Sequence, residues 1–162
     1  MSLRTLLLPI LFLTGVCCQA QSVQQTQNGV KAIANGENVT ISFFSNSIVR
    51  IVKSETENPA LSQAPVVIME PEMVQVKMEQ NEGSLRVSSS ELTVSLDLTT
   101  GCVRVEEANG NPLIAEKDYG TQFVPATYNN EHSHLVKQAF RLQPDEKVYG
   151  LGQQQTGQFC QR

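Results

Sequence analysis

The chain has 162 residues, of which 12 are Lys or Arg and 16 are Asp or Glu, so its formal net charge is −4 at pH 7. This length is enough for one domain of ordinary size. Binding to phosphates needs a dense surface of Lys and Arg, and the sequence contains no basic cluster. The composition therefore argues against nucleic acid and anionic membranes as partners.

Residues 1–20 have the pattern of a secretory signal peptide. Arg4 supplies a positive charge, and residues 6–13 form an apolar run that is too short to span a bilayer. Cleavage is expected after Ala20, so we predict an exported protein, either periplasmic or secreted. No second hydrophobic run follows, and we therefore predict no transmembrane segment.

The cysteines lead to two further expectations. Acylation of Cys17 or Cys18 would anchor the protein to a membrane surface, but the preceding residues match a lipoprotein signal poorly, so export without an anchor is favoured. Cys102 and Cys160 remain after cleavage. A disulfide between them is compatible with export. Two unpaired thiols are favoured, because nothing in the sequence brings these residues together.

Residues 21–29 are polar and aperiodic, which predicts a flexible leader. From residue 30 to residue 162 the sequence predicts one domain of short strands separated by turns. Alternating or β-branched apolar residues mark the first strands, at residues 39–43, 48–52, 66–68, 74–78 and 85–87.

The clearest hairpin follows. Its first strand places four apolar side chains on one face: Leu92, Val94, Leu96 and Leu98. After a turn at residues 99–101, Val103 and Val105 return on the buried face, so that Cys102 and Arg104 point outward. A second turn at residues 108–112 contains an Asn-Gly pair, which is favoured in tight hairpins, and residues 113–114 begin another strand.

No window of eleven or more residues has helical periodicity. Strands of four to seven residues recur with turn signals between them, a spacing that is typical of antiparallel sandwiches and barrels. The sequence thus predicts an all-β antiparallel fold.

No catalytic constellation stands out, and we predict no cofactor. The segment Gly150–Gly152 lacks the third glycine of a dinucleotide-binding loop, because Gln155 occupies that place. The acidic pairs Glu106-Glu107 and Asp145-Glu146 are adjacent, so along a strand their side chains point to opposite faces. The two carboxylates of a glycosidase must instead converge on one bond.

Two histidines and two tyrosines are weaker candidates. His132 and His134 share a face if they lie on a strand, but no third ligand is spaced to complete a metal site, so a solvated pair is favoured and no metal is predicted. Tyr119 and Tyr128 flank polar residues that we expect to form loops. Stacking against a sugar is one role for these rings, and ordinary packing is the favoured one.

The C-terminal segment carries a recognisable sequence motif: Phe140, Asp145-Glu146, Val148 and then Tyr-Gly-Leu-Gly-Gln at residues 149–153. It resembles the end of the N-terminal domain in glycoside hydrolase family 31, which includes α-glucosidases and α-xylosidases. The glutamines at 153–155 are similar to the α-xylosidase-like bacterial branch. Residues 39–53 and 92–105 are similar to an early strand pair and a later hairpin of these domains, so the resemblance spans about residues 28–162.

The resemblance implies a β-sandwich of the galactose-mutarotase-like type, packed against a catalytic (β/α)8 barrel beyond residue 162. In the family, two aspartates of that barrel act as nucleophile and acid/base in a retaining mechanism that cleaves terminal α-xylosidic or α-glucosidic bonds. No catalytic residue can be carried over, so we expect this chain alone to be inactive. Gln153, Gln154 and Gln155 are the candidate substrate-adjacent residues, at the rim of the active site.

The implied partners are the barrel and, through the whole enzyme, an α-linked oligosaccharide. A stand-alone carbohydrate-binding or adhesion module is the alternative, although the chain has no Trp. A structural domain without a ligand, associated with export, is the third possibility.

Overall fold

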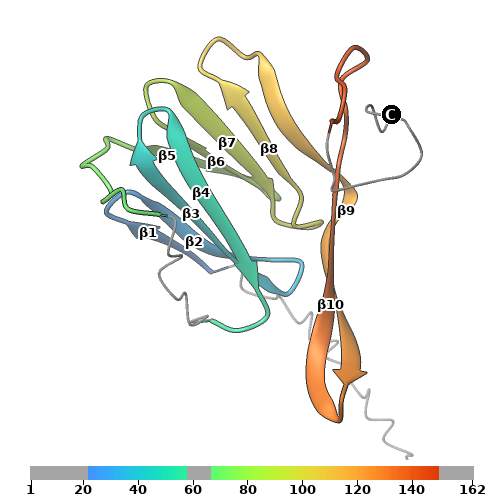
Figure 1. The fold of residues 1–162 in the computed structure, drawn as a ribbon. Helices are drawn as coiled ribbons and strands as arrows, with labels where there is room; N and C mark the ends of the chain where they lie inside the picture. Colours follow the sequence, from blue (N-terminus) through green and yellow to red (C-terminus); the bar gives the residue numbers. More distant parts are fainter. Residues whose placement is uncertain (1–21, 58–66, 150–162) are drawn as a thin grey trace, which may run out of the picture.

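The structure is a computed structural model, and it describes residues 22–57 and 67–149. Within these ranges the regular elements are ten β-strands in two antiparallel sheets (Figure 1). The strands are β1 (Val23–Thr26), β2 (Gly29–Ala34), β3 (Glu37–Ser45), β4 (Ile48–Ser54), β5 (Lys77–Asn81), β6 (Ser84–Ser88), β7 (Leu92–Asp97), β8 (Val103–Glu107), β9 (Pro112–Tyr128) and β10 (Glu131–Phe140).

The two sheets differ in width. The first contains four strands in the order β1-β2-β3-β4, and the second contains six in the order β10-β9-β8-β7-β6-β5. Each pairing joins strands that are consecutive in the sequence, as hairpin connections do. The wider sheet extends past the narrower one on the side of β8, β9 and β10 (Figure 1).

The core lies between the sheets and is built from alternate residues of their strands. Val39, Ile41 and Phe43 of β3 are at most 1% exposed, and Val94 and Leu96 of β7 are fully buried. Because successive side chains of a strand point to opposite faces, this alternation is what makes one face of each sheet apolar. The predicted all-β antiparallel sandwich is confirmed.

The central hairpin follows the sequence-based prediction closely. Leu92 and Leu98 are also buried, and Val103 and Val105 return on the same inner face while Arg104 is exposed. Cys102 is half-buried rather than fully outward. Thr93, whose side chain alternates to the other face of β7, is only 7% exposed, so this strand is covered on both sides at its start.

The prediction of a flexible leader at residues 21–29 differs from the structure, because Val23–Thr26 forms β1 and pairs with β2 in a four-residue ladder. Val23 packs against the core, which gives this polar segment an apolar anchor. Gly29 begins β2 against β3 so closely that a Cβ there would lie 1.9 Å from the Ile41 carbonyl oxygen. The backbone contact therefore requires a glycine.

Two other expected strands need correction. Val67 and Ile68 lie outside any strand, and Val66 lies outside the described residues. The strand expected at residues 74–78 begins only at Lys77, because the preceding residues have no ladder partner in the described part, although Val74 is buried in the core.

The largest difference is the hairpin of β9 and β10. Only Leu113 and Ile114 near its start were expected as strand, and Tyr119 and Tyr128 were expected in loops, yet β9 runs for 17 residues and β10 for 10. Asn129 and Asn130 connect them with φ of 48° and 64°, as a two-residue type I′ turn requires. The hairpin runs along the side of the sandwich and projects beyond it (Figure 1).

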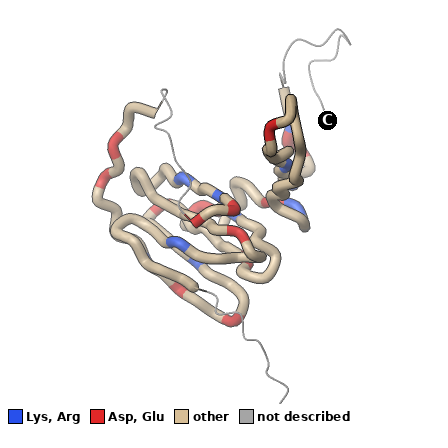
Figure 2. The backbone as a smooth tube through the Cα atoms, turned by 90° about the horizontal axis from the view of Figure 1, so that it is seen from below, with Lys and Arg blue, Asp and Glu red and all other residues tan. Residues whose placement is uncertain are grey.

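The described residues contain no helix that is long and apolar enough to cross a bilayer. Basic and acidic residues are interspersed along the chain, as Figure 2 shows.

Candidate functional site

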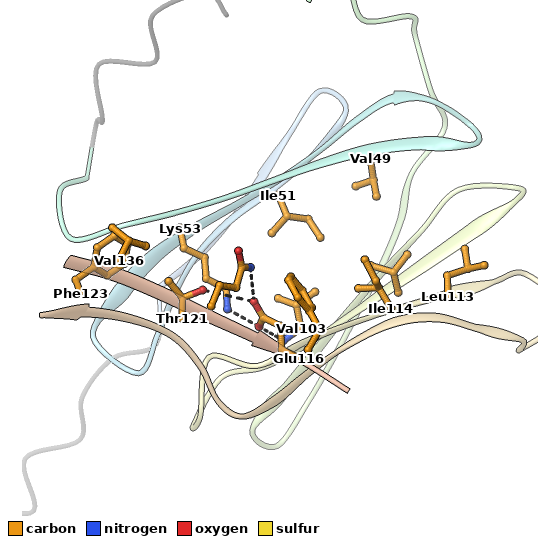
Figure 3. A pocket seen from close by; sticks show the side chains of 13 residues that line it. Val49, Ile51, Lys53, Val103, Leu113, Ile114, Glu116, Thr121, Phe123 and Val136 are labelled. Atoms are coloured by element: carbon orange, nitrogen blue, oxygen red, sulfur yellow. Dashed lines mark hydrogen bonds and ion pairs between the residues drawn. The ribbon is translucent and has the colours of Figure 1, made fainter. Parts of the chain in front are cut away.

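A groove of about 670 Å³ opens where the wider sheet extends past the narrower one. We call it the lateral groove (Figure 3). Its walls come from β4 on one side and from β8, β9 and β10 on the other. The lining residues are Val49, Ile51, Lys53, Val103, Val105, Leu113, Ile114, Glu116, Thr121, Phe123, Val136, Gln138 and Phe140.

The lining follows from strand alternation. Residues 49, 51 and 53 of β4 share one face, which is turned toward the second sheet (Figure 3). Val103 and Val105 belong to the buried core, and Val49 and Ile51 pack against it. The lateral groove is thus an open continuation of the space between the sheets.

One ion pair lies within this apolar surface. Lys53 Nζ is 2.5 Å from Glu116 Oε2, and the two side chains are only 5% and 3% exposed. They come from β4 and β9 and point toward each other in the groove (Figure 3). The pair joins the narrow sheet to the β9–β10 hairpin.

The polar atoms of this pair have further partners. Glu116 Oε2 accepts a hydrogen bond from the Val103 amide at 2.7 Å, and its Oε1 accepts one from Gln138 Nε2 at 3.0 Å. Lys53 Nζ also donates to the Gly101 carbonyl at 2.7 Å. Buried charges are tolerated when they are paired and hydrogen-bonded in this way. This arrangement holds the strands together and leaves neither group free for acid–base chemistry.

A third charged group lies nearby. Burial raises the pKa of Glu37 above its ordinary value of 4.5, Lys53 lowers it, and the like charges of Glu116 and Glu55 raise it further. Glu37 is therefore influenced by one positive charge, Lys53, and by two negative charges, Glu116 and Glu55.

The expected rim residues cannot be placed. Gln153, Gln154 and Gln155 lie outside the described residues, as does the segment 150–152. Tyr149, the first residue of the Tyr-Gly-Leu-Gly-Gln run in the C-terminal sequence motif, is 64% exposed.

The acidic pairs have local partners. Glu106 lies 3.5 Å from Arg104 and 3.9 Å from Arg86. Glu107 Oε2 accepts hydrogen bonds from Asn109 and Asn111 at 2.9 Å, which lower the pKa of this carboxyl and hold the 108–112 turn. Asp145 and Glu146 are exposed.

His132 and His134 both lie on β10. His134 Nε2 is 3.0 Å from Glu55 Oε2, and His132 Nδ1 is 3.5 Å from the Thr127 hydroxyl. Among residues 22–57 and 67–149, no three His, Cys, Asp or Glu side chains gather as a metal site would need.

The remaining candidates are a thiol and two tyrosines. Cys102 is unpaired, and its Sγ lies 3.2 Å from the Lys117 carbonyl oxygen, whereas Cys160 lies outside the described residues. Tyr119 and Tyr128 are 47% and 76% exposed, so the expectation of ordinary packing is wrong for both rings in this chain.

Sequence reasoning missed the Lys53–Glu116 pair. One signal was present: Lys53 continues the inward face of Val49 and Ile51 at a spacing of two, and a buried lysine needs a carboxylate partner. The partner, 63 positions away, could not be chosen among the 16 acidic residues without the strand pairing.

Comparison with known proteins identifies a family and several relatives with a similar sequence. The model of the glycosyl hydrolase 31 N-terminal galactose mutarotase-like domain matches residues 38–162. The chain is 29% identical over 116 residues to alpha-glucosidase 2 of Bacillus thermoamyloliquefaciens, which covers 71% of this chain and 14% of that protein. It is 31% identical over 123 residues to an alpha-xylosidase of Saccharolobus solfataricus, which covers 74% of this chain and 16% of that protein.

Solved structures show the same fold. The chain aligns with a family 31 alpha-xylosidase from Xanthomonas citri at a TM-score of 0.69 and 24% identity, covering 86% of this chain and 16% of the other. A family 31 alpha-xylosidase from a soil metagenome, complexed with xylose, aligns at a TM-score of 0.66 and 17% identity, covering 86% and 23%. The chain thus spans about one seventh of the length of the curated relatives it matches.

Proposed function

Because the chain belongs to the glycosyl hydrolase 31 N-terminal galactose mutarotase-like domain family, we propose that it serves as the non-catalytic N-terminal domain of an exported glycoside hydrolase. The whole enzyme would cleave terminal α-xylosidic or α-glucosidic bonds by a retaining mechanism. The observation that carries this proposal is the family match over residues 38–162. The names of the two curated relatives support the substrate class.

The chemistry of the described residues supports a non-catalytic role. Glu116 is the one buried carboxylate in the described part, and its oxygens are occupied by Lys53, Val103 and Gln138. A retaining glycosidase needs two carboxyl groups about 5–5.5 Å apart with access to the sugar. We assign the nucleophile and the acid/base to a catalytic barrel elsewhere in the whole protein.

The proposed structural role is to brace that barrel. On the outer face of the β9–β10 hairpin, the cross-strand partners Val124 and Leu135 are 37% and 54% exposed, and Tyr128 is 76% exposed. An isolated two-stranded hairpin is marginally stable in water, so contact with a second domain would stabilise this arm. Gln153, Gln154 and Gln155 follow the hairpin in sequence, and we propose that they reach the rim of the active site.

The test compares the full product of the gene with the 162-residue chain, using aryl α-xylosides and aryl α-glucosides. We expect hydrolysis by the full product with retention of anomeric configuration, and none by the 162-residue chain. Hydrolysis by the shorter chain would contradict the non-catalytic assignment. Failure of the full product on both substrates would contradict the substrate class.

The exposed tyrosines favour a second candidate function, direct carbohydrate binding by this domain. Aromatic rings that are exposed on a strand are suited to stacking against sugars. Titration of the 162-residue chain with xyloglucan and malto-oligosaccharides distinguishes the two functions. Saturable binding that Tyr128→Ala abolishes would favour the binding module, and no binding would favour the bracing role.

A further inference from the structure

The chain contains three asparagines that are followed directly by glycine: Asn28, Asn35 and Asn109. Asparagine is a chemically labile residue, and glycine is its least hindered neighbour because it has no Cβ beside the backbone nitrogen. That nitrogen can attack the side-chain amide carbon of the asparagine when the two atoms approach each other. The local structure therefore decides which of the three pairs can react.

Asn28 is held on several sides. Its Nδ2 donates a hydrogen bond to the Glu72 carbonyl at 2.6 Å, and its own carbonyl accepts one from the Phe43 amide at 2.8 Å. Gly29 lies in ladders with both β1 and β3, and a Cβ there would lie 1.9 Å from the Ile41 carbonyl oxygen. Neither the side chain nor the glycine backbone is therefore free to rotate toward the other.

Asn109 is exposed, but hydrogen bonds hold both of its reacting groups. Its Nδ2 donates to Glu107 Oε2 at 2.9 Å, and its Oδ1 accepts from the Asn111 amide at 2.8 Å. The Gly110 amide, which would be the nucleophile, donates to the Glu107 carbonyl at 2.9 Å. A reaction at this pair must first break these contacts.

Asn35 and Gly36 form the two-residue turn between β2 and β3, with φ of 50° and 79°. Both residues are exposed, and the space around Gly36 is open. In the part of the chain that the structure describes, neither the Asn35 side chain nor the Gly36 amide forms a hydrogen bond. Of the three pairs, this is the one whose reacting groups are both unengaged.

We propose that Asn35 is a site of spontaneous deamidation. The Gly36 nitrogen forms a bond to Cγ of Asn35, and the side-chain nitrogen leaves as ammonia with the proton of the Gly36 amide, so that a cyclic imide remains. Water then opens the ring. Addition at Cγ breaks the bond between Cγ and the Gly36 nitrogen and gives aspartate. Addition at the main-chain carbonyl carbon breaks the peptide bond to Gly36 and gives isoaspartate. Both products add a negative charge to the turn.

Isoaspartate changes this turn more than aspartate does. It routes the main chain through Cγ and so adds a backbone atom to a two-residue turn that closes on the pair Ala34 and Glu37. The Asn35 amide also donates to the Leu98 carbonyl at 3.1 Å, which links the narrow sheet to the residue that follows β7. Isoaspartate therefore loosens both the closing pair and this link between the sheets.

Peptide mapping by mass spectrometry measures the conversion of all three asparagines while the full product of the gene is incubated in mildly alkaline buffer. We expect Asn35 to convert about tenfold faster than Asn28 or Asn109, a factor that one or two hydrogen bonds are worth. In guanidinium chloride the three rates should become similar, because the folded contacts are lost. Conversion of Asn35 no faster than that of Asn109 in the folded protein, or the same ranking in the unfolded chain, would overturn the proposal.

Glu107→Ala isolates the effect of the hydrogen bonds. It removes the acceptor of Asn109 Nδ2, and it lies in a different turn from Asn35. We expect conversion of Asn109 to accelerate about two- to tenfold, the range that one hydrogen bond is worth, while the rate at Asn35 stays the same. An unchanged rate at Asn109 would overturn the ranking of the sites by their hydrogen bonds.

Asn35→Asp is the matched control for the structural consequence, because it carries the charge of the product on an unaltered main chain. Hydrogen exchange compares this variant with the isoaspartate form, which is separated from the aged protein by chromatography. We expect the Ala34 and Glu37 amides to exchange about tenfold faster in the isoaspartate form, because the turn that closes their pair is opened. Equal exchange in the two proteins would overturn the loosening of the turn.

Discussion

Lys53 on β4 and Glu116 on β9 form an ion pair of 2.5 Å in which both side chains are almost fully buried. The pair connects the edge of the narrow sheet to the long hairpin of the wide one, and it brings Val103 of β8 into the same hydrogen-bond network. Together with the β8–β9 ladder and the contact between His134 and Glu55, it holds the β9–β10 hairpin in place.

Removing the carboxylate should be costly, because it leaves the Lys53 charge buried without its counter-charge. Glu116→Ala is expected to lower the free energy of unfolding by about 3–5 kcal/mol, measured by urea denaturation. Glu106→Ala is the matched control, since Glu106 pairs with two arginines that are more than half exposed. It should cost about 0–1 kcal/mol. Equal losses for the two variants would contradict the prediction that the buried ion pair contributes more to stability than the exposed one.

Replacing both partners should recover part of this loss. In Lys53→Met with Glu116→Gln, no charge remains buried, and the glutamine oxygen still accepts from the Val103 amide. We expect the double variant to be more stable than the sum of the two single losses predicts, with a coupling energy of about 1–3 kcal/mol. A double-mutant cycle measures that term. Strict additivity would contradict direct coupling between the two side chains.

The sequence predicted most of the sandwich but not the hairpin or its ion pair, for a physical reason. β3 and β7 are half-buried, so their side chains alternate between apolar and polar, and alternation is visible in the sequence. β10 is exposed along almost its whole length in this chain, so no buried face imposes a pattern on it. The available signal was Asn129-Asn130, two residues that tolerate positive φ.

The partners of long-range side-chain contacts could not be predicted from the sequence either. Alternation along β4 is a signal that Lys53 faces inward, but its partner depends on the fold of β9, whose pairing with β10 shifts register between Gln138 and Phe140. That irregularity brings Glu116 and Thr121 to the same groove although their sequence parity differs. A regular strand would not do this.

Glu37 should make stability depend on pH. Its pKa is raised in the fold above the ordinary value of 4.5, mainly by burial, so the native state keeps this proton to a higher pH than the unfolded state does. Between the unfolded and the folded pKa the native state binds more protons, and the free energy of unfolding therefore falls as pH rises.

Glu37→Gln removes this titration. Urea denaturation of both proteins from pH 4 to pH 7 should show the wild type losing stability relative to Glu37→Gln as pH rises above 4.5. The difference should then level off. A difference that stays constant, or that changes in the opposite direction, would contradict the raised pKa.

The Asn129-Asn130 turn offers a stabilising change. Both residues have positive φ, and Asn130 has a φ of 64° that glycine adopts at lower cost. Asn130→Gly should raise the free energy of unfolding of the hairpin by about 0.5–1 kcal/mol. Slower amide exchange at the end of β9 and at the start of β10, on the two sides of this turn, would show it. Asn109→Gly, in the separate 108–112 turn, is the control and should leave that exchange unchanged.

Substitutions at Gly29 and Gly36 distinguish the cost of a steric clash from the cost of backbone strain. A Cβ at Gly29 would lie 1.9 Å from the Ile41 carbonyl oxygen, an atom of the neighbouring strand that cannot move without breaking the β2–β3 ladder. Gly36 has open space around it, and its φ of +79° is its only constraint. Gly36→Ala should therefore cost about 1–2 kcal/mol, and Gly29→Ala should cost more than that. Denaturation of the two variants side by side checks the order. If Gly29→Ala were the milder change, the close approach of β2 to β3 would not be a constraint on this fold.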